Sequence, residues 1–83
     1  MKILYFAWLR EKTGIDQEDV SPPDHVTDVT SMIEWLKSRG PGVEEAFADP
    51  NRVRAAVNQE AVSLDHALNP NDEVAFFPPV TGG

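Results

Sequence analysis

The strongest constraint on this 83-residue chain is a single stripe of apolar side chains with helical spacing. The stripe falls at i, i+3, i+4 and i+7 and consists of Val29, Met32, Ile33 and Leu36. It predicts one main helix from about Asp28 to Arg39, with Thr27 as its N-cap and Gly40-Pro41 as its stop signal. A lone amphipathic helix must bury its apolar face against another layer, and the remaining segments favour strands. We therefore expect a sheet with this helix packed on one face.

The strand-like segments give the order of that sheet. Residues 1–9 are almost all apolar, which predicts a strand with both faces covered, and polar residues 10–14 predict a hairpin connection. We also expect strands at 15–20, 53–58, 61–64 and 73–77, turns at 58–60 and 69–72, and a short helical turn at 43–47. The first and last strands are the most apolar, so they should lie side by side and parallel at the centre. This order predicts an α+β fold of the β-grasp (ubiquitin-like) type, a mixed sheet of four to five strands with one main helix packed on one face.

Length and composition narrow the class of protein. The chain suits a single domain, 1–83, in which we expect residues 79–83 to form a flexible C-terminal tail. The 14 acidic and 7 basic residues give a net charge of −7, which disfavours nucleic acid and anionic membranes as partners and suits a basic protein surface. No apolar run approaches the ~20 residues of a membrane span. Lys2 leads into a strand instead of a signal peptide, so we expect a cytoplasmic location.

The sequence lacks the patterns of a self-contained active site. His25 and His66 do not have the spacing of a metal site, and there is no cysteine to bind a metal or act as a nucleophile. Gly40-Pro41-Gly42 is not followed by the lysine and serine of a phosphate-binding loop. We therefore expect a chain that is non-catalytic by itself and binds no metal or cofactor of its own.

The C-terminal segment is the remaining feature that suggests a chemical role: Pro78, Pro79, Val80, Thr81, Gly82 and Gly83. The prolines end the last strand and stiffen the exit from the sheet. The residues after Val80 reach about 10 Å further, at ~3.3–3.6 Å per residue, and glycines can thread a narrow channel because they have no Cβ atom. A terminal glycine also presents the least hindered carboxylate. The pattern favours Gly83, assisted by Gly82, as the working group, and the alternative is an idle terminus.

Three stretches resemble the MoaD family, the small subunits of molybdopterin synthase: AAVNQ at 55–59, VSLDHAL at 62–68 and, most specifically, DEVAFFPPVTGG at 72–83. Near the front of the chain, Phe6-Ala7, Arg10-Glu11 and Gly14 also agree with the family. The resemblance covers nearly the whole chain, although residues 16–54 agree only in pattern. Thiamin sulfur carriers of the ThiS type share the fold and the Gly-Gly end but generally lack the FFPPVTGG run. A related sulfur carrier for thiamin or another pathway is therefore the alternative.

The resemblance implies sulfur-carrier chemistry at Gly83. In the family, an E1-like activating enzyme uses ATP and Mg²⁺ to adenylate the C-terminal carboxylate, and sulfur from a persulfide, supplied by a desulfurase, replaces AMP to give a thiocarboxylate. The tail then enters a MoaE-type large subunit, in a two-plus-two heterotetramer, where sulfur passes to cyclic pyranopterin monophosphate to build the molybdopterin dithiolene. ATP would bind the activating enzyme and not this chain. Because ubiquitin shares the activation chemistry, a protein modifier conjugated through Gly83 is a further alternative.

Strand alternation predicts where such partners dock. Val74 and Phe76 should face the helix, so that their neighbours in the strand face outward. We expect an apolar patch at the base of the tail, formed by Phe6, Ala61 and Phe77. The tail residues expected to contact a partner are Pro78, Pro79, Val80 and Thr81. Arg10 is the expected salt-bridge residue for the activating enzyme, and the alternative for the patch is cover by the chain's own loops.

Overall fold

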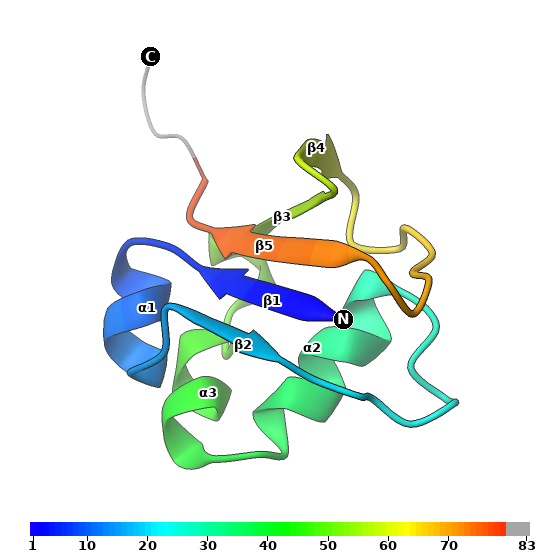
Figure 1. Ribbon diagram of the computed structural model, residues 1–83. Helices are drawn as coiled ribbons and strands as arrows, with labels where there is room; N and C mark the ends of the chain where they lie inside the picture. The colour runs from blue at the N-terminus through cyan, green and yellow to red at the C-terminus, as the bar shows by residue number, and fades with distance from the viewer. Residues whose placement is uncertain (80–83) are drawn as a thin grey trace.

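Five strands form one mixed sheet in the order β2-β1-β5-β3-β4, with the helices on one of its faces (Figure 1). The computed structural model describes residues 1–79. In chain order the elements are β1 (Lys2–Tyr5), α1 (Trp8–Thr13), β2 (Gln17–Asp19), α2 (Val29–Lys37), α3 (Pro41–Ala46), the 3-10 helix η1 (Pro50–Arg52), β3 (Arg54–Val57), β4 (Glu60–Val62) and β5 (Glu73–Phe77). β1 and β5 are parallel, and the other neighbouring strands are antiparallel. The predicted β-grasp fold is confirmed.

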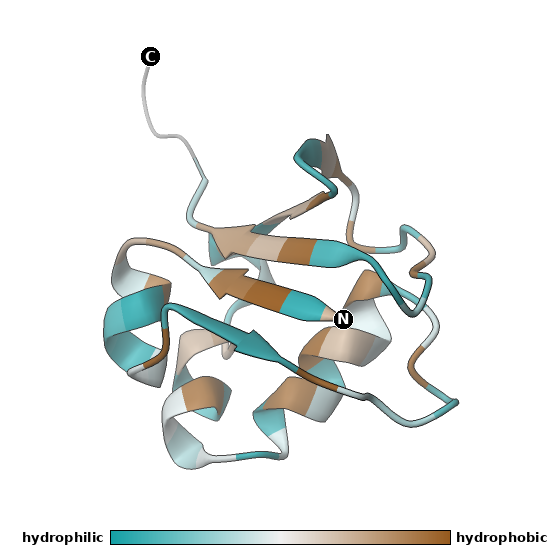
Figure 2. Cartoon of the chain, viewed as in Figure 1, coloured by the Kyte–Doolittle hydropathy of each residue, from teal (hydrophilic) through white to brown (hydrophobic). Residues whose placement is uncertain are grey.

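The central position of β1 and β5 follows from their apolar side chains. Ile3 and Tyr5 of β1 pair with Val74 and Phe76 of β5, and all four are at most 1% exposed. The edge strand β2 is hydrophilic over its whole length (Figure 2). A strand with polar residues on both faces is stable only where one side meets water. The predicted parallel pairing of the first and last strands is confirmed.

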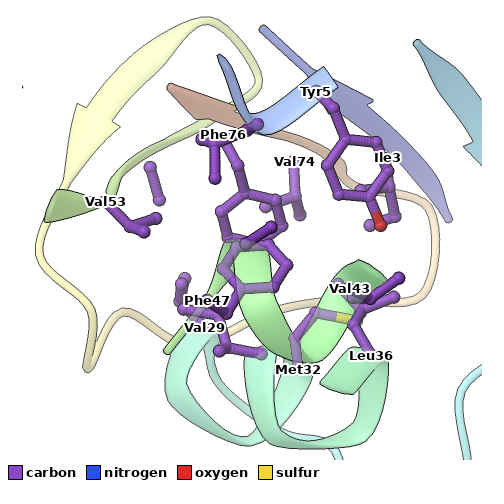
Figure 3. Close-up of a cluster of buried hydrophobic side chains, with 14 of the residues drawn as sticks. Ile3, Tyr5, Val29, Met32, Leu36, Val43, Phe47, Val53, Val74 and Phe76 are labelled. Atoms are coloured by element: carbon purple, nitrogen blue, oxygen red, sulfur yellow. The ribbon is translucent and has the colours of Figure 1, made fainter. Parts of the chain in front are cut away.

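The core lies between this sheet and α2 (Figure 3). The rings of Tyr5, Phe47 and Phe76 meet there with centroid distances of 4.9 to 6.3 Å, which is the range of favourable aromatic pairs. The predicted apolar stripe of α2 packs against the sheet and forms the other side of the core. Val29, Met32 and Leu36 are fully buried, and Ile33 is nearly so. At about 1.5–3 kcal/mol per buried side chain, these four stabilise the domain by roughly 6–12 kcal/mol.

The start of α2 differs by one residue from the prediction. Its N-cap is Asp28 and not Thr27. The Asp28 carboxylate accepts a hydrogen bond from the Ser31 N–H at 2.8 Å, and the Ser31 hydroxyl oxygen accepts one from the Asp28 N–H at 3.1 Å. Hydrogen bonding of its carboxylate to the Ser31 side chain, and then to the Ser31 N–H, lowers the pKa of Asp28. Thr27 stays outside the helix because its carbonyl accepts the N–H of Leu68 at 2.9 Å.

The prediction of one strand over residues 1–9 and a hairpin over 10–14 is wrong. β1 ends at Tyr5, and α1 follows and ends at Gly14, which has a φ of 74°. This arrangement buries Leu9 completely and moves Trp8 away from the sheet, where the Arg52 guanidinium lies 4.8 Å from the centroid of its ring. An apolar run does not distinguish a strand from a short helix, and six residues bury too little to show a helical period.

α1 packs against α3, and this contact holds α1 in place. It begins at Pro41, two residues earlier than predicted, because proline suits the first position of a helix. The two helices approach so closely that a Cβ atom on Gly42 would lie 2.7 Å from the carbonyl oxygen of Lys12. The Lys12 ammonium also lies 2.8 Å from the Glu45 carboxylate. These contacts fix α1 and therefore the turn that connects it to β1.

Candidate functional site

The helices leave the opposite face of the sheet uncovered (Figure 1), and the end of this face near Phe77 is mainly apolar. We define the outer face as Leu4, Phe6, Arg54, Ala56, Ala61, Ala75 and Phe77. Side chains alternate along a strand, so the buried Val74 and Phe76 place Ala75 and Phe77 on this face. The strand register aligns its middle row across four strands, in the order Leu4, Ala75, Ala56 and Ala61. Small side chains in this row leave a shallow apolar surface.

A second row crosses the outer face where the chain leaves β5. Phe77 pairs with Arg54 of β3, and on its other side Phe6 follows β1, with its N–H donating to the Phe76 carbonyl at 3.0 Å. Phe6 is 47% exposed, and it is the one exposed large apolar side chain among residues 1–79. The predicted patch residues Phe6, Ala61 and Phe77 therefore share one face. The alternative required the chain's own loops to cover this patch. Phe6 and Ala61 are exposed, so loops within residues 1–79 do not cover them.

An unusual backbone conformation places Phe6 beside the base of the tail. Ala7 has φ 54° and ψ −132°, a region that residues other than glycine rarely adopt. The Leu9 N–H closes the turn by donating to the Phe6 carbonyl at 3.1 Å. Strained conformations persist only where the surrounding structure holds them. Here the buried Leu9 and the packing of α1 on α3 hold the turn.

Two arginines lie near this end of the sheet, and the sequence predicted a binding role for one of them, Arg10. Arg10 is exposed on α1 and takes part in none of the ion pairs between residues 1–79. Arg54 was missed. The alternation of RAAV in β3 was the available signal, because it places Arg54 on the same face as Ala56. Arg54 is an exposed residue, and its guanidinium Nη1 donates to the Val53 carbonyl at 3.1 Å.

The first two residues of the predicted tail follow β5 directly. Pro78 and Pro79 are half-buried and have no N–H group, so they cannot continue the pairing with β1 or β3. The chain therefore departs from the sheet at the row of Phe6, Phe77 and Arg54. The other predicted residues, Val80, Thr81, Gly82 and Gly83, lie outside the described residues.

The polar cluster around the Tyr5 hydroxyl has a structural role. The Tyr5 hydroxyl donates to the Glu18 carboxylate at 2.8 Å, and the Arg39 guanidinium lies 2.9 Å from the same carboxylate. Burial, reinforced by the bond to Glu18, raises the pKa of Tyr5 far above its usual value, so the phenol stays protonated. The cluster joins β1, β2 and the end of α2. Within residues 1–79, no group of three or more His, Cys, Asp or Glu could hold a metal ion, and no helix is long and apolar enough to cross a membrane.

Both the sequence and the fold have relatives among known proteins. The ThiS family matches residues 3–83. The chain is 43% identical over 83 residues to the molybdopterin synthase sulfur carrier subunit of Escherichia coli strain K12, covering 100% of this chain and 99% of the relative. It is 35% identical over 86 residues to the human subunit of the same name, covering 100% and 93%. The crystal structure of small archaeal modifier protein 1 from Haloferax volcanii matches with a TM-score of 0.78 at 30% identity, covering 96% and 97%. The chain therefore belongs to the ThiS family, in the group of the molybdopterin synthase sulfur carrier subunits.

Proposed function

We propose that this chain is the sulfur carrier subunit of a molybdopterin synthase and that the carboxylate of Gly83 is its working group. The observation that carries the proposal is the course of β5. This central strand runs from the core directly into Pro78-Pro79 at the edge of the apolar outer face. A partner that covers the outer face therefore also meets the point where the chain leaves the sheet, at Pro78-Pro79. The full-length similarity to sulfur carrier subunits supports the same function.

The chemistry follows from the limits of a carboxylate. A carboxylate cannot accept sulfur directly, because oxide is too poor a leaving group. An activating enzyme therefore joins the Gly83 carboxylate to AMP, with ATP and Mg²⁺, and releases pyrophosphate. A persulfide supplied by a desulfurase displaces AMP, and a second thiol then releases the thiocarboxylate as a disulfide forms. A thiocarboxylic acid is more acidic than a thiol, so its sulfur is anionic at neutral pH and can attack cyclic pyranopterin monophosphate.

We assign the pterin pocket and the acid–base groups to a large subunit of the MoaE type, in a two-plus-two heterotetramer. The outer face supports this division, because aromatic side chains such as the exposed Phe6 and the half-buried Phe77 are favoured anchors of protein interfaces. ATP and Mg²⁺ belong to the activating enzyme, which we expect to contact Arg10. We propose a cytoplasmic location, where ATP is available to the activating enzyme.

Deletion of Gly83 tests the proposal. One residue spans ~3.3–3.6 Å, and a misplacement of about 1 Å can lower a rate about a hundredfold. The shortened chain keeps a terminal carboxylate on Gly82 but holds it short of both active sites. We expect sulfur transfer to fall at least about a hundredfold, with an unchanged melting temperature. Thiocarboxylate formation is followed by intact mass and molybdopterin synthesis in a reconstituted assay with the large subunit.

The matched control is Gly83→Ala, which keeps the length of the tail and adds one methyl group. A loss with the deletion that greatly exceeds the loss with Gly83→Ala identifies reach as the requirement. Normal sulfur transfer by the chain without Gly83 would contradict the proposed function.

A protein modifier is the second candidate function. The observation in its favour is the structural likeness to small archaeal modifier protein 1 from Haloferax volcanii. In this case Gly83 would form an amide bond with a lysine of a target protein after the same activation. Intact mass of the protein purified from its own host separates the two. A sulfur-for-oxygen increment supports the carrier, whereas a ladder of larger conjugates supports the modifier.

A further inference from the structure

We propose that Arg54 determines which partner binds the outer face. It would pair with a carboxylate of the large subunit, beside the pocket of that subunit that receives Phe77. The inference rests on the proposed function, because it assumes that a large subunit covers the outer face. Arg54 pairs with Phe77 across β3 and β5, and along its own strand the next outer residue is Ala56. It is thus the charged member of an otherwise apolar end of the outer face.

The hydrogen-bonding capacity of Arg54 points to an acceptor on the partner. A guanidinium has five N–H donors. In Arg54, Nη1 donates to the Val53 carbonyl, and Arg54 makes no other side-chain hydrogen bond within residues 1–79. A partner that covers Phe77 removes water from the guanidinium, and a desolvated charge weakens binding unless acceptors replace the water.

A carboxylate is the acceptor that fits this position. It matches the planar fork of a guanidinium with two parallel hydrogen bonds and balances its charge. The ion pairs between residues 1–79 are Lys12–Glu45, Lys37–Glu34 and Arg39–Glu18, and Arg54 takes part in none of them. The acceptor is therefore expected from the large subunit.

The distribution of charge over the chain supports a negative partner surface at this end. α1 and residues 50–57 contain four basic residues and one acidic residue, a net charge of +3: Arg10, Lys12, Arg52 and Arg54 against Glu11. Glu45 of α3 pairs with Lys12, so the basic residues here that take part in none of the ion pairs between residues 1–79 are Arg10, Arg52 and Arg54. The rest of the chain has the other 3 basic and 13 acidic residues, a net charge of −10, and the two parts sum to −7. The contact of Arg52 with the Trp8 ring places α1 beside η1.

The positive segments flank the point where the chain leaves the sheet. Phe6, which leads into α1, and Arg54 lie on the two sides of Phe77. Arg10, Arg52 and Arg54, which take part in none of the ion pairs between residues 1–79, therefore favour a negative partner surface at this end. A uniformly basic partner, as the net charge alone suggested, would repel this end.

Binding of Arg54 variants to the large subunit of the same organism tests the proposal. We expect Arg54→Glu and Arg54→Ala to raise the dissociation constant about 30-fold or more. A loss of this size is typical when one member of a hydrogen-bonded charge pair is removed from an interface. Arg54→Lys should retain part of the affinity, because lysine keeps the charge but not the planar fork. Calorimetric titration measures the affinities, and thermal melting of each variant verifies its fold.

The matched control is Lys37→Glu, which changes the charge equally on α2, on the other side of the sheet. It should alter the affinity less than about threefold. An equal loss in Arg54→Glu and Lys37→Glu, or wild-type affinity in both Arg54→Glu and Arg54→Ala, would overturn the proposal. Failure of the wild-type chain to bind the large subunit would instead contradict the proposed function.

A second measurement locates the facing carboxylate. Each acidic residue of the large subunit is changed in turn to lysine and tested against Arg54→Glu. We expect one such change to restore binding of Arg54→Glu while it weakens binding of the wild-type chain. If no change restores binding, Arg54 has no single facing carboxylate and the proposal fails.

Discussion

The conformation of Ala7 decides where Phe6 and α1 lie. Its φ of 54° and ψ of −132° suit glycine far better than alanine, and the sequence has no glycine there to mark a turn. A strand was therefore predicted to continue through this position. The turn after β3 contrasts with it, because Asn58 tolerates its φ of 52° and asparagine is a known turn residue. Its neighbour Gln59 has a φ of 71°, so one favourable residue type, Asn58, was sufficient to predict that turn.

Replacing Ala7 with glycine should stabilise the domain. Relief of an unfavourable backbone conformation is worth about 1–3 kcal/mol, and the greater freedom of glycine in the unfolded chain offsets about 0.4–1 kcal/mol of this. We expect a net gain of about 1 kcal/mol and a melting temperature about 4–8 °C higher. Ala61→Gly, an equal change at an exposed position of β4, should lower stability by roughly 0.5–1 kcal/mol. A lower melting temperature for Ala7→Gly would show that the turn is not strained.

Among the elements, the turn at residues 69–72 and the β3–β4 hairpin are joined by Asp72 and Asn58. The Asp72 carboxylate accepts the Asn69 N–H at 2.8 Å and the Asn58 side-chain amide at 3.0 Å. The Asn58 amide oxygen in turn accepts the Glu73 N–H at 3.0 Å. The sequence predicted both turns from their local residue types. It did not predict the link, because a side-chain bond across 14 residues leaves no local pattern.

The link makes stability depend on pH through Asp72. The hydrogen bonds from Asn69 and Asn58 lower its pKa from 3.8. Because the folded state has the lower pKa, the carboxylate stabilises the fold above the unfolded-state pKa, and this stabilisation is lost as the pH falls through the folded-state pKa. Asp72→Asn should therefore lower the free energy of unfolding by about 1–3 kcal/mol at neutral pH. The difference from the wild type should shrink below about pH 3, as urea titrations at both pH values would show.

Asp24→Asn is the control for this prediction, since Asp24 is an exposed residue in the loop before α2. It should change the free energy of unfolding by no more than about 0.5 kcal/mol at neutral pH. An Asp72→Asn difference of the same size at both pH values would mean that hydrogen bonding to the ionised carboxylate does not contribute.

Across the whole molecule, the core and the exposed apolar patch lie on opposite faces of one sheet. The alternation of EVAFF predicted that Phe76 faces the core and Phe77 faces outward, and the apolar ends of the chain predicted the central pair β1 and β5. The patch residues were predictable for the same reason. α1 was not, because its packing depends on contacts with α3 that lie more than thirty residues away. Arg54 was not predicted, because the patch was defined by apolar side chains. The alternation of RAAV nevertheless places Arg54 on the same face.

The division into two faces predicts opposite outcomes for two neighbouring phenylalanines. Phe77→Glu, like Phe6→Glu, should leave the cooperative melt of the free chain nearly unchanged and weaken binding to the large subunit, since truncation of a central aromatic anchor alone typically costs about 2–4 kcal/mol. Phe76→Ala should instead lower the free energy of unfolding by about 3–5 kcal/mol, because Phe76 is fully buried against Tyr5 and Phe47. Thermal melting and calorimetric titration of the same three variants separate the effects. If Phe77→Glu unfolds the free chain, the outer face belongs to the core; if it binds as tightly as the wild type, the large subunit docks elsewhere.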